Sequence, residues 1–238
     1  MKSRFLIAVA ILSFLTLTTP MAAQALRYDF DFYRITNNGS TDIASQLDAD
    51  VYDPTDASDA WGQSIESDSV LFVFQNSVGT ASNIHEIYFD DGPLLRQTSL
   101  VNSLSGYTNY TSPPVKPGNL PGGNNLDPSF VASVAFGADV KGAPDNGINS
   151  ADDALGIIIQ LVTPTTGTYW ENLMRALTNG DLRLGLHVGS IGDTGWSDSF
   201  VSTPPDSPPP AVPEPATMLL LGAGLFGLAG LARKGLFK

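Results

Sequence analysis

Residues 181–188 read D-L-R-L-G-L-H-V. Leu182, Leu184, Leu186 and Val188 alternate with glycine or polar residues. A hydrophobic period of two predicts a β-strand with one buried face. This is the clearest strand in the chain, and it indicates a sheet that covers a core on one side.

Several other segments show the same alternation or an unbroken apolar run, and each predicts a strand. These segments are residues 26–36, 46–52, 69–75, 83–90, 130–136, 154–162 and a short last strand at 199–202. The run at 69–75, S-V-L-F-V-F-Q, predicts a central strand buried on both faces. Segments rich in Gly, Pro, Asn and Asp separate the strands, and the longest, residues 106–128, predicts a long loop. Residues 53–68 predict an exposed loop from which Trp61 folds back onto the core.

A single short helix is expected between the last strands. Thr168 and Glu171 form a capping box, apolar residues follow at helical spacing, and Asn179-Gly180 provides a stop. Many short strands with one helix favour a mainly β fold, an antiparallel β-sandwich of jelly-roll type.

The chain begins with a basic Met1-Lys2-Ser3-Arg4, continues with an apolar run and reaches Ala23-Gln24-Ala25. This order predicts a secretory signal peptide over residues 1–25. The small residues Ala23 and Ala25 fit a signal peptidase, so we expect cleavage after Ala25. The alternative is an uncleaved membrane anchor.

Residues 212–238 read V-P-E-P-A-T-M-L-L-L-G-A-G-L-F-G-L-A-G-L-A-R-K-G-L-F-K. Residues 216–232 carry no charge, and as a helix they would cover roughly 25 Å, just short of a hydrocarbon core. Arg233 and Lys234 follow and would hold that end in the cytoplasm. A transmembrane helix over residues 216–232 is therefore expected.

This order of parts resembles the PEP-CTERM sorting domain that exosortases recognise. The residues that carry the likeness are Pro213, Glu214 and Pro215, the Gly-rich apolar segment, and the basic Arg233 and Lys234. The resemblance implies an exosortase as processing partner in a Gram-negative bacterium that makes exopolysaccharide. It also implies a temporary inner-membrane anchor, followed by a location at the cell surface or in the extracellular matrix. The alternative is an ordinary tail anchor. Residues 76–95, 118–124 and 181–192 further resemble an extracellular domain found among such sorted proteins.

These segments divide the chain into a signal peptide (1–25), an extracellular β-sandwich domain (26–202), a Pro-rich spacer (203–212) and a sorting signal with its basic tail (213–238). The chain has 24 acidic and 12 basic residues. Five of the basic and one of the acidic residues lie in the two targeting segments, which leaves 23 acidic against 7 basic residues in the exported body. A surface this acidic repels nucleic acid. The chain contains no cysteine, which excludes disulfides and thiolate metal sites.

The sequence offers little for catalysis, and no cofactor is expected. His85-Glu86 could begin a zinc motif, but Phe89 stands where the second histidine should be. No G-x-S-x-G elbow accompanies the two histidines, and the many carboxylates do not define a glycosidase pair. Calcium is the one metal considered. Its weak candidate ligands are Asp145, Asn149, Asp152 and Asp153, whose spacing departs from an EF-hand, and turn formation is the alternative role.

The sequence therefore predicts a non-enzymatic exported protein that an exosortase sorts to the cell surface or into an extracellular polymer matrix. A carbohydrate-binding module for exopolysaccharide is the alternative. Its sugar platform would come from Tyr107, Tyr110, Trp61 and Trp196. A secreted hydrolase is a third hypothesis.

Overall fold

Eleven strands form two antiparallel sheets in this computed structural model, which describes residues 27–112, 118–133 and 136–204. In spatial order, the five-stranded sheet consists of β1 (Arg27–Phe30), β3 (Leu47–Tyr52), β4 (Ser69–Asn76), β9 (Ala154–Leu161) and β6 (Leu95–Ser105). The six-stranded sheet consists of β2 (Phe32–Arg34), β11 (Trp196–Ser202), β10 (Arg183–Ile191), β5 (Asn83–Asp90), β8 (Ala138–Val140) and β7 (Tyr110–Thr111). The expectation of a mainly β, antiparallel fold is confirmed.

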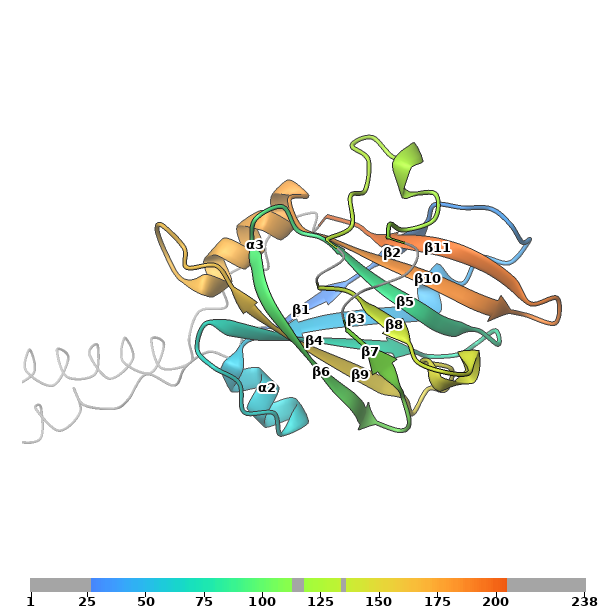
Figure 1. Cartoon of the computed structure of the whole chain (residues 1–238), viewed down its shortest axis with the longest axis horizontal. Helices are drawn as coiled ribbons and strands as arrows, with labels where there is room; N and C mark the ends of the chain where they lie inside the picture. Colours follow the sequence, from blue (N-terminus) through green and yellow to red (C-terminus); the bar gives the residue numbers. More distant parts are fainter. Residues whose placement is uncertain (1–26, 113–117, 134–135, 205–238) are drawn as a thin grey trace, which may run out of the picture. The chain divides into compact units, whose positions relative to one another are not determined.

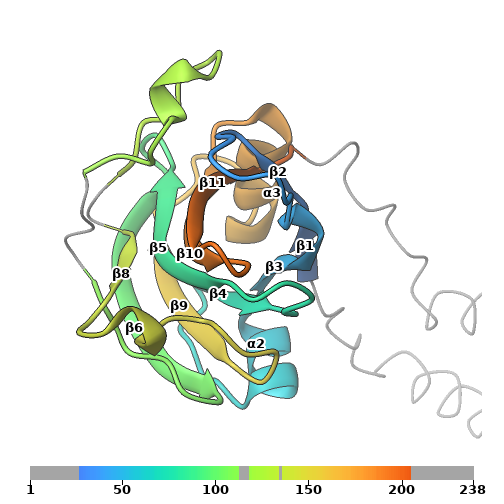
Figure 2. The same cartoon turned by 90° about the vertical axis from the view of Figure 1, so that its right-hand side faces the viewer.

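The main core lies where the two sheets face each other (Figures 1 and 2). Phe72 of β4 and Phe89 of β5 come from different sheets and make an edge-to-face contact with ring centroids 5.2 Å apart. Aromatic rings prefer this geometry, which adds to the burial of their apolar surface. The contact shows that the central strands of the two sheets share one core.

Strand β10 places its leucines in that core, as the alternation predicts. Leu184 and Leu186 are fully buried and lie opposite Phe89 and Ile87 of β5. Strand β11 pairs with the other edge of β10, with Leu186 opposite Phe200. The strand that the sequence marks most clearly is thus a central strand of the six-stranded sheet.

The predicted strand at 26–36 is two strands that belong to different sheets. β1 pairs with β3, whereas β2 pairs with β11, and the chain changes sheets at Asp31. Phe30 and Phe32, on either side of the change, are both buried in the core. A single alternating pattern can serve both strands because the same face stays inward through the crossing.

Helix α3 (Tyr169–Asn179) has the predicted capping box, with Thr168 accepting from the Glu171 amide and the Glu171 carboxylate accepting from the Thr168 amide. Gly180 ends the helix with a φ of 73°, a conformation that glycine adopts at little cost. The prediction of a single helix is wrong, because α2 (Pro54–Trp61) forms within the segment expected to be a loop. Asp53 caps α2 and Pro54 occupies its first turn.

Helix α2 explains why β4 is buried on both faces. A second apolar cluster lies on the far side of the five-stranded sheet and includes Ala57 of α2, Leu71 and Val73 of β4, and the partly buried Trp61. The Trp61 ring meets that of Tyr52 edge to face, with centroids 6.4 Å apart. Trp61 therefore packs back on the sheet, as expected.

Two strand predictions fail. Residues 130–133 and 136 form no strand, although Phe130 is fully buried, and strand β8 begins only at Ala138. Phe130 instead packs over Gly185 of β10, where an added Cβ would lie 2.9 Å from its ring. Strand β6 has eleven residues, and no strand was predicted there. The last two strands also extend beyond the predicted 181–188 and 199–202, since β10 runs to Ile191 and β11 starts at Trp196.

Candidate functional site

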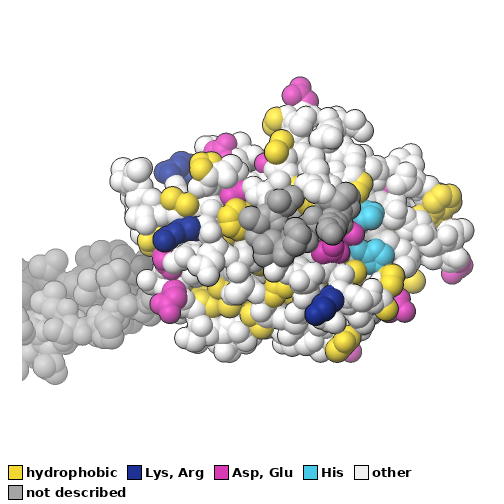
Figure 3. All heavy atoms as spheres, in the orientation of Figure 1, with side chains coloured by type: hydrophobic (Ala, Val, Ile, Leu, Met, Phe, Trp, Pro, Cys, Tyr) yellow, Lys and Arg dark blue, Asp and Glu magenta, His cyan; other side chains and the backbone are white. Residues whose placement is uncertain are grey.

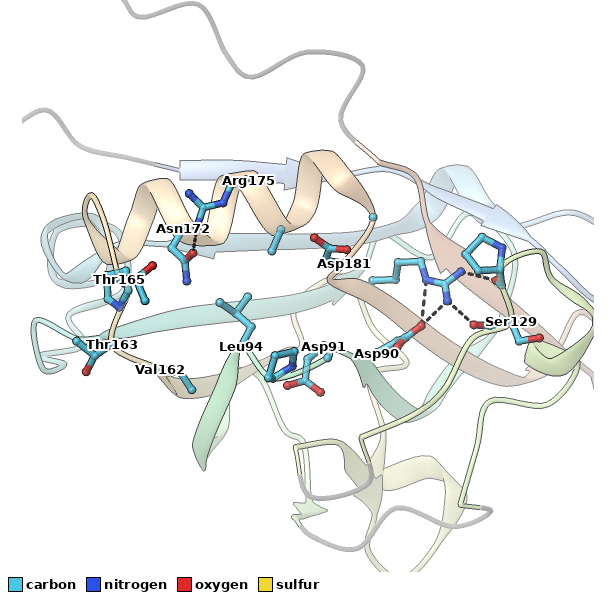
Figure 4. Close-up of a pocket in the computed structure, with 17 residues that line it drawn as sticks. Asp90, Asp91, Leu94, Ser129, Val162, Thr163, Thr165, Asn172, Arg175 and Asp181 are labelled. Atoms are coloured by element: carbon cyan, nitrogen blue, oxygen red, sulfur yellow. Dashed lines mark hydrogen bonds and ion pairs between the residues drawn. The ribbon is translucent and has the colours of Figure 1, made fainter.

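A groove lies between helix α3 and the turn that joins β5 to β6 (Figure 4). Its volume is about 690 Å³, within the range of ligand pockets. The chain between β9 and α3 forms a further side, through Val162, Thr163 and Thr165. The groove is open to solvent and has a mixed lining of charged, hydroxyl, amide and apolar side chains.

One wall of the groove is fixed by Asp91. This carboxylate is 1% exposed and accepts hydrogen bonds from the Leu95 amide, at 3.0 Å, and from the Ser133 hydroxyl. Burial raises the pKa of Asp91, and these two hydrogen bonds oppose that shift. Asp91 therefore shapes the β5–β6 turn and has little capacity left for a ligand.

Arg183 of β10 forms another wall and is fully occupied. Its Nε donates to Asp90 at 3.1 Å, and its remaining nitrogens donate to the carbonyls of Pro128 and Ser129 at 2.9 and 2.6 Å. The guanidinium also lies 5.4 Å from the centre of the Phe130 ring. Arg183 thus ties the loop before β8 to the sheet.

Arg175 of α3 lines the groove and, unlike Arg183, remains available to bind a ligand. Leu173, Ala176 and Leu177 form the buried face of the helix, and Arg175 is exposed. Its guanidinium donates to the Asn172 side chain and makes no ion pair with any carboxylate of the described residues. Figure 4 shows Asn172 and Arg175 on α3, with Leu94, Val162 and Thr163 across the groove and Asp181 at the end of the helix.

A second polar cluster occupies the outer face of the six-stranded sheet. Asp139, Glu86, His187 and Ser199 lie opposite one another in four adjacent strands. His187 Nδ1 bonds to Glu86, and the His85 ring stands 6.3 Å from that of His187 (Figure 3, cyan). Burial lowers the pKa of His85, and Glu86 partly offsets this effect. In the described part of the chain, no three His, Asp or Glu side chains are arranged to hold a metal ion.

The calcium candidates lie in one loop, where Asp153 already has three donors. Its carboxylate accepts from the amides of Tyr107 at 2.9 Å, Ser150 at 3.1 Å and Asn149 at 3.3 Å. The Asn149 side chain donates to the Asp145 carbonyl, and Asp152 is exposed. The structure brings these residues together as a hydrogen-bonded turn, and calcium binding stays a prediction.

The four aromatic residues expected to bind sugar do not form one platform, and this expectation is wrong for Tyr110. Tyr110 is 3% exposed, and its hydroxyl bonds to the backbone of Ile84 and Ile148 inside the core. Trp61 is held in the cluster beside α2. Tyr107 and Trp196 are exposed, but Tyr107 lies between β6 and β7 and Trp196 is the first residue of β11. No sequence motif predicts the α3 groove, although Arg175 stands on the polar side of an amphipathic helix.

The residues assigned to export and sorting lie outside the described part of the chain. They are Ala23, Ala25, Pro213, Glu214, Pro215, Arg233 and Lys234, and the predicted apolar helix at 216–232 lies there too. Neither α-helix that the structure describes is long and apolar enough to cross a bilayer.

Comparison with known proteins gives one match. The family model described as PEP-CTERM protein-sorting motif matches residues 211–234. No curated protein and no solved structure matches the chain. The motif indicates export and sorting by an exosortase in general, and the match covers none of the residues that form the two sheets.

Proposed function

We propose that this chain, which carries a PEP-CTERM protein-sorting motif, is a non-enzymatic exported protein that an exosortase releases to the cell surface or the extracellular polymer matrix. The observation that carries the proposal is the match at residues 211–234. The predicted signal peptide at residues 1–25 supports the same route.

The position of the motif relative to the sheets supports processing. Strand β11 ends at Ser202, and Thr203 donates its amide to the Asp31 carbonyl at 2.9 Å. Pro213 follows eleven residues after Ser202. Removal of residues 216–238 would therefore leave every described strand and its hydrogen bonds intact.

The geometry around His187 supports a non-enzymatic role. Glu86, His187 and Ser199 follow one another across three strands, which is the order of groups in a serine hydrolase triad. However, Ser199 is 1% exposed, and its hydroxyl makes no hydrogen bond within the described residues. A nucleophile must reach both its base and its substrate, and this hydroxyl reaches neither.

The α3 groove favours carbohydrate binding as a second candidate function. Its hydroxyl and amide groups can exchange hydrogen bonds with sugar hydroxyls, and Leu94 and Val162 offer apolar contact. This candidate is compatible with export, because a matrix protein can bind the polymer around it.

Cell fractionation tests the sorting proposal. We expect the protein at the cell surface or in the medium of a host that has the exosortase, and in the inner membrane of a host that lacks it. A variant with Pro213, Glu214 and Pro215 replaced by alanine should stay in the inner membrane in both hosts. Equal distribution of the native protein in the two hosts would overturn the proposal.

A further inference from the structure

We infer that the groove beside α3 binds a polysaccharide whose sugars carry carboxylate groups, and that Arg175 recognises the carboxylate. The inference deepens the carbohydrate-binding candidate and does not depend on sorting. Binding is measured on purified protein and sorting in cells, so either can fail alone.

Arg175 is free of any carboxylate partner among the described residues and can bind an anion. The exported body is strongly acidic, and three of its other arginines are paired with carboxylates: Arg27 with Asp29 and Asp50, Arg34 with Asp198, and Arg183 with Asp90. Arg175 has only the neutral Asn172 as a side-chain partner and lines the groove beside α3. A guanidinium binds a carboxylate through two parallel hydrogen bonds, so a ligand carboxylate would satisfy the donors that the protein leaves unused.

The neighbours of Arg175 suit a sugar ring. Asn172 stands one turn away on α3, and Thr163 and Thr165, in the segment between β9 and α3, add two hydroxyls. These groups both donate and accept, as sugar hydroxyls do. Val162, next to Thr163, is 38% exposed and can contact the apolar face of a sugar ring. Hydroxyl, amide and apolar contacts beside one cation match a sugar acid.

The charges of the groove disfavour a densely charged ligand. Asp181 lines the same groove and would repel closely spaced anions. Since Arg183 is occupied by Asp90 and two carbonyls, one guanidinium is left for an anion. A nucleic acid or polyphosphate needs several cations along its path, whereas one sugar acid needs one.

The test is calorimetric titration of the full chain, held in a detergent without a sugar head group, with a six-residue oligogalacturonate. We expect binding by the native protein, and binding roughly 10- to 100-fold weaker by Arg175→Gln, because a charged hydrogen-bond pair is lost. Lys141→Gln is the matched control, since it removes the same charge at an exposed site outside the groove. Asp181→Asn should bind more tightly, because it removes a repelling carboxylate.

Two comparison ligands make the inference specific. Neutral maltohexaose should bind at least about tenfold more weakly than the oligogalacturonate, because it offers Arg175 no carboxylate. A hexaglutamate peptide should also bind weakly, since it lacks the ring hydroxyls. No binding of oligogalacturonate by the native protein would overturn the inference. The inference would also be overturned if Arg175→Gln and Lys141→Gln lost the same affinity for oligogalacturonate. Binding of the peptide as tight as that of oligogalacturonate would overturn it too.

Discussion

Asp29 of β1 lies directly opposite Asp50 of β3, and the Arg27 guanidinium contacts both carboxyl groups, at 2.6 and 3.1 Å. Burial, and then the neighbouring Asp29 carboxyl group, raise the pKa of Asp50 to about 7. The Asp50 carboxyl group is in turn the main cause that lowers the pKa of Asp29. The pairing of the first strand with its sheet is thus coupled to the protonation of Asp50.

The raised pKa of Asp50 predicts a pH-dependent contribution to stability. In the folded state Asp50 keeps its proton up to about pH 7, whereas the unfolded chain loses it near the ordinary value of 3.8. Between these values the folded state binds more protons, so this contribution is present at low pH and is lost as pH rises toward 7. The Asp29 contribution has the opposite sign and is lost as pH falls below 3.8.

Asp50→Asn should remove the Asp50 contribution, because an amide cannot ionise. At pH 8 we expect the variant to unfold with a higher free energy than the native protein, by up to a few kcal/mol, and at pH 4 the two should be nearly equal. Chemical denaturation at both pH values measures this. Comparing the two proteins cancels the effect of His85, whose lowered pKa acts in the opposite direction. Asp193→Asn, in an exposed turn, is the control, and the same change there would refute the assignment.

Leu184 tests the orientation of β10. It is fully buried opposite Phe89, so Leu184→Ala should cost about 2–5 kcal/mol of unfolding free energy. Leu184→Asp should prevent folding, because it buries an unpaired charge. Thermal and chemical denaturation measure both effects. Val131→Ala, at a side chain that is 65% exposed, should change stability by less than about 0.5 kcal/mol. An unchanged melting temperature for Leu184→Ala would mean that β10 turns its other face to the core.

Arg183 should control the order of the loop before β8. Arg183→Met keeps an apolar stem beside Phe130 but removes the bonds to Asp90, Pro128 and Ser129. We expect faster hydrogen exchange at the Phe130 amide, which bonds to the Gly123 carbonyl at 3.0 Å, and a loss of about 1–3 kcal/mol in stability. Arg96→Met, on the exposed side of β6, is the control. Unchanged exchange at Phe130 would show that apolar packing alone holds the loop.

Much of the sheet could be predicted because its central strands are buried on a clear pattern. β4 and β9 are nearly continuous apolar runs, and β10 alternates. Strand β6 is not predicted by its sequence because it is an edge strand, in which Leu95, Leu100 and Leu104 lack a period of two. Its register shifts twice against β9, which accounts for the irregular spacing.

Local signals explain two further errors. The start of α2 carries a signal, since Asp53 followed by Pro54 is a common helix start. However, the Asp, Ser and Ala residues that follow also suit a loop. Phe130 suggested a strand because aromatic residues favour sheets, whereas here it covers Gly185 from a loop.

The groove could not be predicted, because its walls come from distant parts of the sequence. Leu94, Val162 and Arg175 are far apart in the sequence and line one groove in the folded chain. The sorting motif is the reverse case, since its residues are adjacent and the sequence alone carries the signal.

The mass of the intact exported protein tests the central claim most directly. The protein should be collected from the cell surface or medium and measured whole. We predict a mass that corresponds to a chain beginning at Leu26 and lacking residues 216–238, because the signal peptide is removed after Ala25 and the exosortase acts at Pro213-Glu214-Pro215. A surface protein whose mass still includes Lys238 would contradict the account and show that residues 216–232 remain as an ordinary anchor.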